Sequence, residues 1–352
     1  MPDERVEAAL KNWAPRFTAQ GVDYNDFVRT AGRVDKWEDW CREWVATGDV
    51  HHELAQKAEA QGSAISAGEA YIGAALCYHF GRFVFQDFPD EYMSASRKSV
   101  EAFARGLKLL EPGAERLEIP FEGARMAATL RRPLNAARPP LILLLPGLDS
   151  AKEEFFCWEE VFLKRGLATL SLDGPGQGEC GYHSHIRPDF ESAVSTALDA
   201  LSRRSDLDLD RIGLAGVSLG GYYAARAAAF EPRLKAAVGN CGPFNFGECW
   251  DNTPSLTRAA FQYHSGAQDA ADARRRAGQL SLEGVAHRIK QPFLVIHGRL
   301  DRLIPWEQAH KIVQAVGPNA ELAMFENGNH VCNNIPYIYR PLTADWLREK
   351  LG

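Results

Sequence analysis

The sequence lacks a hydrophobic run long enough to cross a bilayer. Its most apolar stretch, PPLILLLPG at residues 139–147, is far shorter than the roughly 20 residues that a membrane helix needs. The first residues, MPDERVEAALKNW, are acidic and contain no apolar core, so they do not resemble a secretory signal peptide. We therefore expect a cytoplasmic protein.

Paired cysteines and an excess of one charge are also missing. The cysteines are scattered, odd in number and without a CxxC motif, as is typical of reduced thiols. They are Cys41, Cys77, Cys157, Cys180, Cys241, Cys249 and Cys332. A net charge of -6 offers no basic surface for nucleic acid or an anionic membrane, so we expect neither as a partner. With 45% hydrophobic and 24% charged residues, the composition is that of an ordinary globular protein.

Alternating strand patterns are absent from residues 1–112, where apolar side chains recur at spacings of three and four. Residues 26–48 predict one helix closed by Gly48. Residues 63–85 predict a buried helix, and a third helix ends at Pro112 and Gly113. We therefore expect a helical N-terminal cap domain at 1–113.

The pattern changes after Gly113, in residues 114–352. Two strands joined by Glu122 and Gly123 predict a hairpin. Short apolar runs then alternate with helical segments, which predicts a mostly parallel sheet with helices on both faces. The runs are PLILLL, LATLSLD, RIGLAGV, LKAAVGN, PFLVIHG and ELAMFE. A helical insertion near 242–290 interrupts this α/β rhythm.

The stretch GVSLG at 216–220 fits the pattern G-x-S-x-G between a predicted strand and a predicted helix. This is the context of a nucleophile elbow, in which a tight turn raises a serine above the sheet of an α/β-hydrolase fold. The dipole of the following helix favours negative charge there. A plain Ser-Gly turn is the alternative, but the strand–turn–helix context favours Ser218 as the nucleophile.

A serine nucleophile needs a base, and the base needs an orienting acid. In this fold the acid and then the histidine follow later strands, which selects Asp301 after PFLVIHG and His330 after ELAMFE. The competing residues fit less well. His297 lies on the strand itself, where burial is expected, whereas Glu307 and His310 fall on the next helix.

An oxyanion hole needs two backbone N–H donors. We expect one from Leu219, directly after the nucleophile. The other is expected from Leu148 in the loop PGLDSAKEE, where Pro146 takes the place of the usual histidine.

Two further motifs predict no cofactor or metal. GQGECG at 176–181 matches the dinucleotide-binding pattern, but no helix opens directly behind it. It predicts a glycine-rich loop at a strand end near the active site. The histidines of HSH at 183–185 have no further ligands nearby in sequence.

Several stretches together resemble the 2,6-dihydroxypseudooxynicotine hydrolase family. They are GLDSAKEE, DGPGQGE, GVSLGGYYAAR, HGRLDRLIP and GNHVCNN. Fungal yellowish-green pigment hydrolases, which shorten polyketide chains, and the fermentation-respiration switch group look related. The resemblance implies hydrolysis of a carbon–carbon bond next to a ketone without metal or organic cofactor. It also implies a catalytic glutamate, for which Glu248 in GPFNFGECW stands at the matching place.

The residues alone leave several alternatives open. Glu248 could instead form a salt bridge in the insertion. In the implied reaction, either His330 or a protonated Glu248 donates a proton to the leaving carbon, and a carboxyl group does so only if burial raises its pKa. A carboxylesterase, a thioesterase or a non-catalytic regulator would share the scaffold. The substrate is expected to be a small molecule, and an exposed, aromatic-rich N-terminal face would allow a homodimer.

Overall fold

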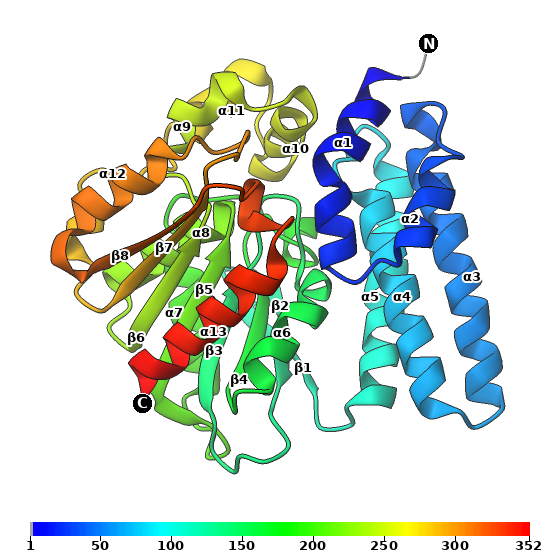
Figure 1. Cartoon of the computed structure of the whole chain (residues 1–352), viewed down its shortest axis with the longest axis horizontal. Helices are drawn as coiled ribbons and strands as arrows, with labels where there is room; N and C mark the ends of the chain where they lie inside the picture. The colour runs from blue at the N-terminus through cyan, green and yellow to red at the C-terminus, as the bar shows by residue number, and fades with distance from the viewer. Residues whose placement is uncertain (1–2) are drawn as a thin grey trace. The chain divides into compact units, whose positions relative to one another are not determined.

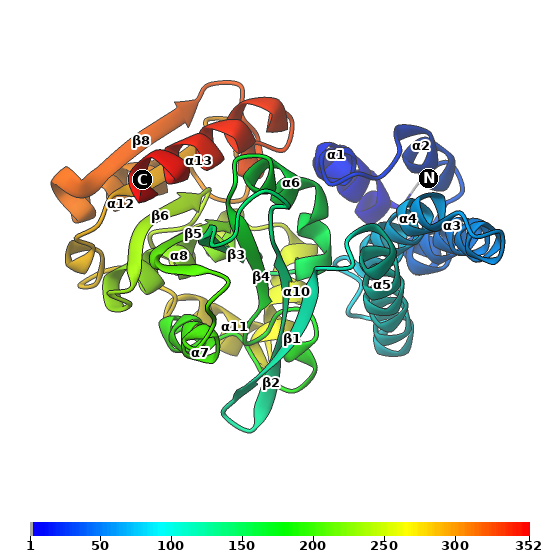
Figure 2. The same ribbon diagram turned by 90° about the horizontal axis from the view of Figure 1, so that it is seen from below.

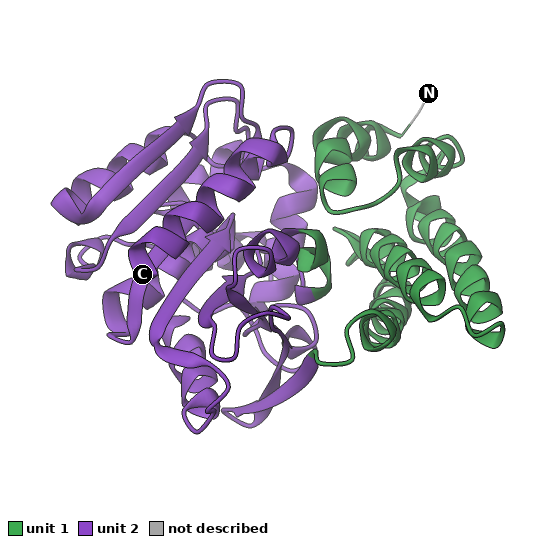
Figure 3. Cartoon of the chain, turned by 60° about the horizontal axis from the view of Figure 1, so that its bottom comes forward, with its two compact units in different colours: residues 1–114, 153–157 green, residues 115–152, 158–352 purple. Residues whose placement is uncertain are grey.

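A computed structural model describes residues 3–352 and divides them into two compact units, which are considered separately (Figure 3). The helical unit holds residues up to 114 together with 153–157, and the sheet unit holds 115–152 and 158–352. The first division lies next to the expected boundary at 113. The return of 153–157 to the helical unit has no counterpart in the sequence pattern. A capping role for the helical unit stays a prediction.

The helical unit is built from five helices (Figure 1). They are α1 (Glu4–Ala19), α2 (Tyr24–Ala31), α3 (Trp40–Ala60), α4 (Ala64–Arg82) and α5 (Pro89–Leu110). The single helix expected over 26–48 is wrong, because α2 ends at Ala31 and α3 runs through Gly48. An added Cβ at Gly48 would lie 2.5 Å from the ring of Tyr78 on α4. Gly48 therefore permits close helix packing and does not end a helix.

Aromatic side chains form the core of the helical unit. Phe17, Trp37, Trp40, Trp44 and Phe80 are all fully buried. Phe17 stands between its neighbours, with ring centroids 3.9 Å from Phe80 and 5.1 Å from Trp44. Most of the N-terminal aromatic surface is thus used inside the unit. This corrects the expectation of an exposed, aromatic-rich face, whereas the homodimer itself stays a prediction.

A buried ionic network holds the segment 153–157 in the helical unit. Arg16 donates two hydrogen bonds of 2.6 Å to the carboxylate of Glu154, and His79 Nε2 lies 3.0 Å from the same group. Arg82 donates to His79 Nδ1, so the imidazole proton resides on Nε2 and points at Glu154. Burial alone would raise the pKa of Glu154, but the positive charge of Arg16 outweighs burial and keeps that pKa well below its usual range.

The sheet unit contains one eight-stranded sheet within the described residues. Its strands are β1 (Glu115–Phe121), β2 (Ala124–Arg131), β3 (Pro140–Leu145), β4 (Ala168–Asp173), β5 (Asp208–Val217), β6 (Leu234–Asn240), β7 (Phe293–Gly298) and β8 (Ala320–Phe325). Their order is β1-β2-β4-β3-β5-β6-β7-β8. Strand β2 runs antiparallel to both of its neighbours, β1 and β4, and the strands β3 to β8 are parallel to one another. The expected α/β-hydrolase fold is confirmed.

Helices cover both faces of this sheet. The remaining helices are α6 (Phe156–Leu163), α7 (Glu191–Leu201), α8 (Leu219–Phe230), α9 (Phe246–Cys249), α10 (Ser255–Ser265), α11 (Ala270–Ala277), α12 (Glu307–Val316) and α13 (Pro336–Leu351). Helices α6 and α13 lie on one face, and α7 and α8 lie on the other (Figure 2). Helices α9 to α11 form the expected insertion between β6 and β7. No helix within residues 3–352 has both the length and the apolar character that crossing a bilayer requires.

The Glu154 network generates a stability prediction. The Glu154→Ala variant should lower the free energy of unfolding by about 3–5 kcal/mol, because a buried guanidinium loses its carboxylate. Chemical denaturation followed by circular dichroism measures this loss. The control is Glu38→Ala, which removes an ion pair whose side chains are 40% and 52% exposed, and it should cost under about 1 kcal/mol. Equal effects of the two variants would contradict a structural role of the buried network.

Candidate active site

Ser218 occupies a strained turn between β5 and α8. Its φ of 57° and ψ of -125° are unusual for a residue with a side chain. The flanking glycines explain how the turn closes. An added Cβ at Gly216 would lie 1.9 Å from the carbonyl oxygen of Gly220. Only glycine can occupy position 216 at this distance. The local sequence therefore dictates the elbow that raises Ser218 above the carboxyl end of β5.

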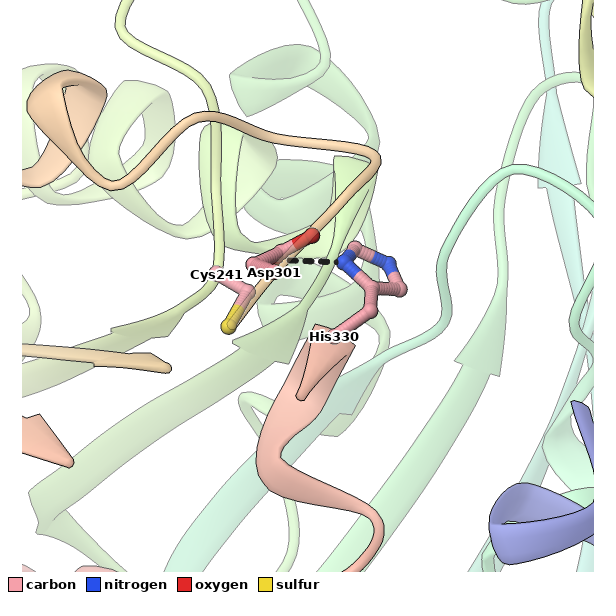
Figure 4. A group of neighbouring side chains, drawn as sticks. All are labelled: Cys241, Asp301 and His330. Carbon is pink, nitrogen blue, oxygen red and sulfur yellow. Dashed lines mark hydrogen bonds and ion pairs between the residues drawn. The ribbon is translucent and has the colours of Figure 1, made fainter. Parts of the chain in front are cut away.

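Three side chains from separate strand ends form a continuous chain of hydrogen bonds. His330 Nε2 lies 2.9 Å from Ser218 Oγ, and His330 Nδ1 lies 2.8 Å from Asp301 Oδ2. Figure 4 shows the second of these bonds. Because the carboxylate accepts from Nδ1–H, Nε2 is left free to accept the serine proton. The structure thus brings Ser218, Asp301 and His330 together, while their catalytic roles stay a prediction.

The carboxylate of Asp301 is fixed on both oxygens. Its Oδ1 accepts the backbone N–H groups of Leu303 at 2.8 Å and Ile304 at 3.0 Å. Burial alone would raise the pKa of Asp301, but the neighbouring His330 and these donors outweigh it and lower that pKa. Asp301 therefore stays ionised and orients the imidazole.

The competing residues lie where the sequence suggested. His297 is fully buried on β7, with Nε2 3.0 Å from the carbonyl oxygen of Ile304 and 3.6 Å from Asp301 Oδ2. Burial lowers the pKa of His297, which favours the neutral ring. Glu307 and His310 are exposed on α12.

The loop after β3 lies against the nucleophile. An added Cβ at Gly147 would come within 3.1 Å of Ser218 Cβ, which places the Pro146–Leu148 segment directly beside the elbow. Leu148 and Leu219 are both buried. Their N–H groups as oxyanion donors stay a prediction.

Glu248 has partners other than the triad. Its Oε2 accepts hydrogen bonds of 2.7 Å from Gln308 Nε2 and from Lys311 Nζ on α12. These two donors lower the pKa of Glu248, whose side chain is 42% exposed. The structure matches the salt-bridge alternative and not a buried, protonated carboxyl group, since exposure and a cation both favour the carboxylate. A catalytic role for Glu248 stays a prediction.

Asn240, at the end of β6, was missed by sequence reasoning. Its carbonyl accepts the N–H of Ser218 at 2.8 Å, and its Nδ2 donates to the carbonyl of Val331 at 3.2 Å. Asn240 thereby links the elbow to the loop that carries His330. A polar residue that ends a buried apolar strand was the available signal.

Cys241, which directly follows Asn240, also lies beside the triad. A ligand atom from each of Cys241, Asp301 and His330 lies within 4.8 Å of the others, a grouping able to hold a cation (Figure 4). However, Asp301 and His330 are already hydrogen-bonded to each other, and burial raises the pKa of the Cys241 thiol. Metal binding would require a thiolate and would break the bond that orients His330.

Fold and site together define a serine-type α/β hydrolase. A profile of the prolyl oligopeptidase family matches residues 154–352. The chain is 33% identical over 349 residues to 2,6-dihydropseudooxynicotine hydrolase of Paenarthrobacter nicotinovorans, covering 99% of this chain and 94% of that protein. The chain therefore belongs to the prolyl oligopeptidase family. It also belongs to the 2,6-dihydroxypseudooxynicotine hydrolase family, as its motifs suggested.

A solved structure and a fungal relative agree with this placement. The crystal structure of a 2,6-dihydroxy-pseudo-oxynicotine hydrolase superposes with a TM-score of 0.88 at 33% identity, covering 97% of this chain and 96% of that one. The 20-hydroxy-prefusarin hydrolase FUS2 of Gibberella moniliformis is 35% identical over 246 residues. That match covers 65% of this chain and 58% of the fungal protein.

A buried cation ties together the loops after β3 and β4. Lys152 Nζ donates to Asp173 at 3.0 Å and to Glu179 at 2.5 Å, and the side chain of Lys152 is 1% exposed. Arg116 adds two hydrogen bonds to Glu179. Burial alone would raise the pKa of Glu179, but Arg116 and Lys152 outweigh it and hold that pKa at about 2.

This shift predicts a pH dependence of stability. Because the folded pKa of Glu179 lies below its usual 4.5, the unfolded chain takes up the proton first as the pH falls. The stabilisation is complete above about pH 4.5 and is lost towards pH 2, amounting to about 3 kcal/mol at most. Melting curves of Glu179→Gln should therefore differ from the wild type at pH 7 and approach it as the pH falls to about 2 and below. The control Glu349→Gln, at a 73% exposed side chain, should run parallel to the wild type throughout. A constant difference for Glu179→Gln across this range would refute the assignment.

Proposed function

We propose that this chain is a serine hydrolase that cleaves a carbon–carbon bond next to a ketone through an acyl-enzyme. Its substrate would be a small aryl ketone or β-diketone. The hydrogen-bond chain from Asp301 through His330 to Ser218 carries the proposal. Similarity over nearly the full length to 2,6-dihydropseudooxynicotine hydrolase supports the ketone as the substrate class.

The first half-reaction uses the serine. His330 Nε2, 2.9 Å from Ser218 Oγ, accepts the hydroxyl proton as the oxygen attacks the ketone carbon. Asp301 holds the imidazole in the required tautomer and stabilises the imidazolium. The oxyanion of the tetrahedral intermediate accepts the N–H groups of Leu148 and Leu219.

Collapse of this intermediate breaks the carbon–carbon bond. The electron pair leaves with the departing carbon, which is a much poorer leaving group than an alkoxide. The substrate must therefore delocalise this charge into a hydroxylated ring or a second carbonyl. His330 Nε2–H donates the proton that completes the leaving group. Water, deprotonated by His330, then attacks the acyl-enzyme. His330 returns this proton to Oγ as the ester bond breaks, which releases the acid and restores neutral Ser218.

A carboxylesterase or thioesterase is the second candidate. The ion pair of Glu248 with Lys311 favours it over any mechanism that uses Glu248 as the acid, because ester cleavage needs no acid beyond His330. A non-catalytic regulator has less support, since it would have no use for the complete hydrogen-bond chain.

The bond specificity can be tested directly with purified protein. The wild type should split a dihydroxyaryl ketone into an arene and a carboxylic acid, as detected by mass spectrometry. The Ser218→Ala variant should lose roughly 10³-fold or more of this rate, because it lacks the nucleophile. A small panel of ketones and a simple aryl ester are measured in parallel.

Each result of this test decides between the candidates. Ester hydrolysis without cleavage of any ketone in the panel would favour the esterase. Failure of Ser218 to react with a fluorophosphonate probe would argue against both enzymatic functions. Ketone cleavage that survives in Ser218→Ala would refute the acyl-enzyme.

The proton donor can be tested separately at Glu248. If His330 is the donor, Glu248→Gln should leave kcat for the ketone within about threefold, since it removes only an exposed ion pair. The control Lys311→Gln removes the other partner of this pair and should behave alike. A fall of roughly 100-fold for the ketone in Glu248→Gln alone, with ester hydrolysis intact, would instead make Glu248 the acid.

A further inference from the structure

Gln177 is fully buried in the loop after β4, the GQGECG stretch. Its Nε2 donates to the carbonyl oxygens of Pro146 at 2.5 Å and Gly147 at 3.0 Å. Its Oε1 accepts the N–H of Gly174 at 3.2 Å. This last bond fixes the amide orientation, because a backbone N–H must face oxygen, so the NH₂ group faces the two carbonyls.

The geometry of the peptide bond extends this contact to the nucleophile. The carbonyl of Gly147 and the N–H of Leu148 belong to one planar unit and point in opposite directions in the trans form. A donor that fixes the carbonyl of Gly147 therefore fixes the direction of the Leu148 N–H. The same loop lies beside Ser218, because a Cβ added at Gly147 would lie 3.1 Å from Ser218 Cβ.

We infer that Gln177 is a positioning residue that aims the Leu148 N–H at the oxyanion. This inference rests on the proposed function, in which Leu148 is an oxyanion donor. Gln177 would act only through the loop, without touching the substrate. Its side chain satisfies two carbonyls at once, which an acidic or an apolar side chain of similar size cannot do.

The surrounding contacts agree with a rigid loop. Lys152, at the far end of the β3 loop, is bonded to Asp173 at the end of β4. Its backbone N–H donates to the Asp173 carboxylate at 2.8 Å, and its Nζ donates to the same carboxylate at 3.0 Å. The β3 loop is therefore tied at both ends to the neighbouring strand end. An oxyanion hole gains from such preorganisation, because its donors need not reorient as charge develops.

The test separates transition-state binding from ground-state binding. Gln177→Leu removes the amide, and Gln177→Glu keeps its shape but removes the donors. For an aryl ester, both variants should lower kcat roughly 10- to 100-fold and leave KM within about twofold. Affinity for an aryl trifluoromethyl ketone, whose adduct with Ser218 carries an oxyanion, should fall by the same factor. The pH midpoint of kcat/KM should not move, since His330 and Asp301 are untouched.

Gln291→Leu is the matched control. Gln291 Nε2 also donates to a backbone carbonyl, that of Ala228 at 2.7 Å near the far end of α8, and its loss should change kcat less than twofold. Wild-type kcat and inhibitor affinity in folded Gln177→Glu would overturn the inference, as would a rise in KM alone. If the wild type neither turns over the ester nor binds the inhibitor, the proposed function itself fails and the inference falls with it. Should Gln177→Leu not fold, the isosteric Gln177→Glu decides the outcome.

Discussion

The close approach of Gly216 to Gly220 is the constraint on which the site depends. Because no side chain fits between the end of β5 and the start of α8, the chain turns within one residue and holds Ser218 at a positive φ. Hydrogen bonds to neighbouring strand ends offset this strain. The main one runs from the Ser218 N–H to the carbonyl oxygen of Asn240 at the end of β6. Cys241 also has a positive φ, so two adjacent strand ends share the strain. The geometry of the site therefore depends on several neighbouring strands at the carboxyl end of the sheet.

The fold could be predicted from the sequence as far as local patterns determine it. Apolar runs between turn residues located the strands of the parallel sheet, since strands buried on both faces need continuous apolar sequence. Gly48 misled because glycine serves two purposes, ending helices and letting helices touch, and only the tertiary partner distinguishes them. The position of residues 153–157 was not predictable either. It depends on Glu154 meeting Arg16 and His79, which are distant in sequence.

Some residues of the candidate site could likewise be predicted from the sequence, and others could not. Ser218, Asp301 and His330 could be named because each follows a strand, and the order of strands along the chain is visible in the sequence. Gln177 stood in a stretch recognised as a loop at a strand end, yet its partners are set by the order of strands in the sheet. Glu248 was placed by family resemblance, which indicates a position but not a partner. Its ion pair with α12 depends on how the insertion folds.

The charge state of Glu248 also limits how carbon–carbon cleavage can proceed. A carboxyl group that donates a proton near neutral pH must be buried away from cations, whereas Glu248 is 42% exposed and bound to Lys311. In the proposed reaction His330 becomes an imidazolium in the first step and lies next to the reacting atoms, so a proton is present without a second acid. The same three residues would then serve ester and ketone alike, and the substrate would determine which bond breaks. In this proposal the triad supplies a proton to the leaving carbon, so a ketone would react only if that carbon can delocalise the electron pair within the substrate.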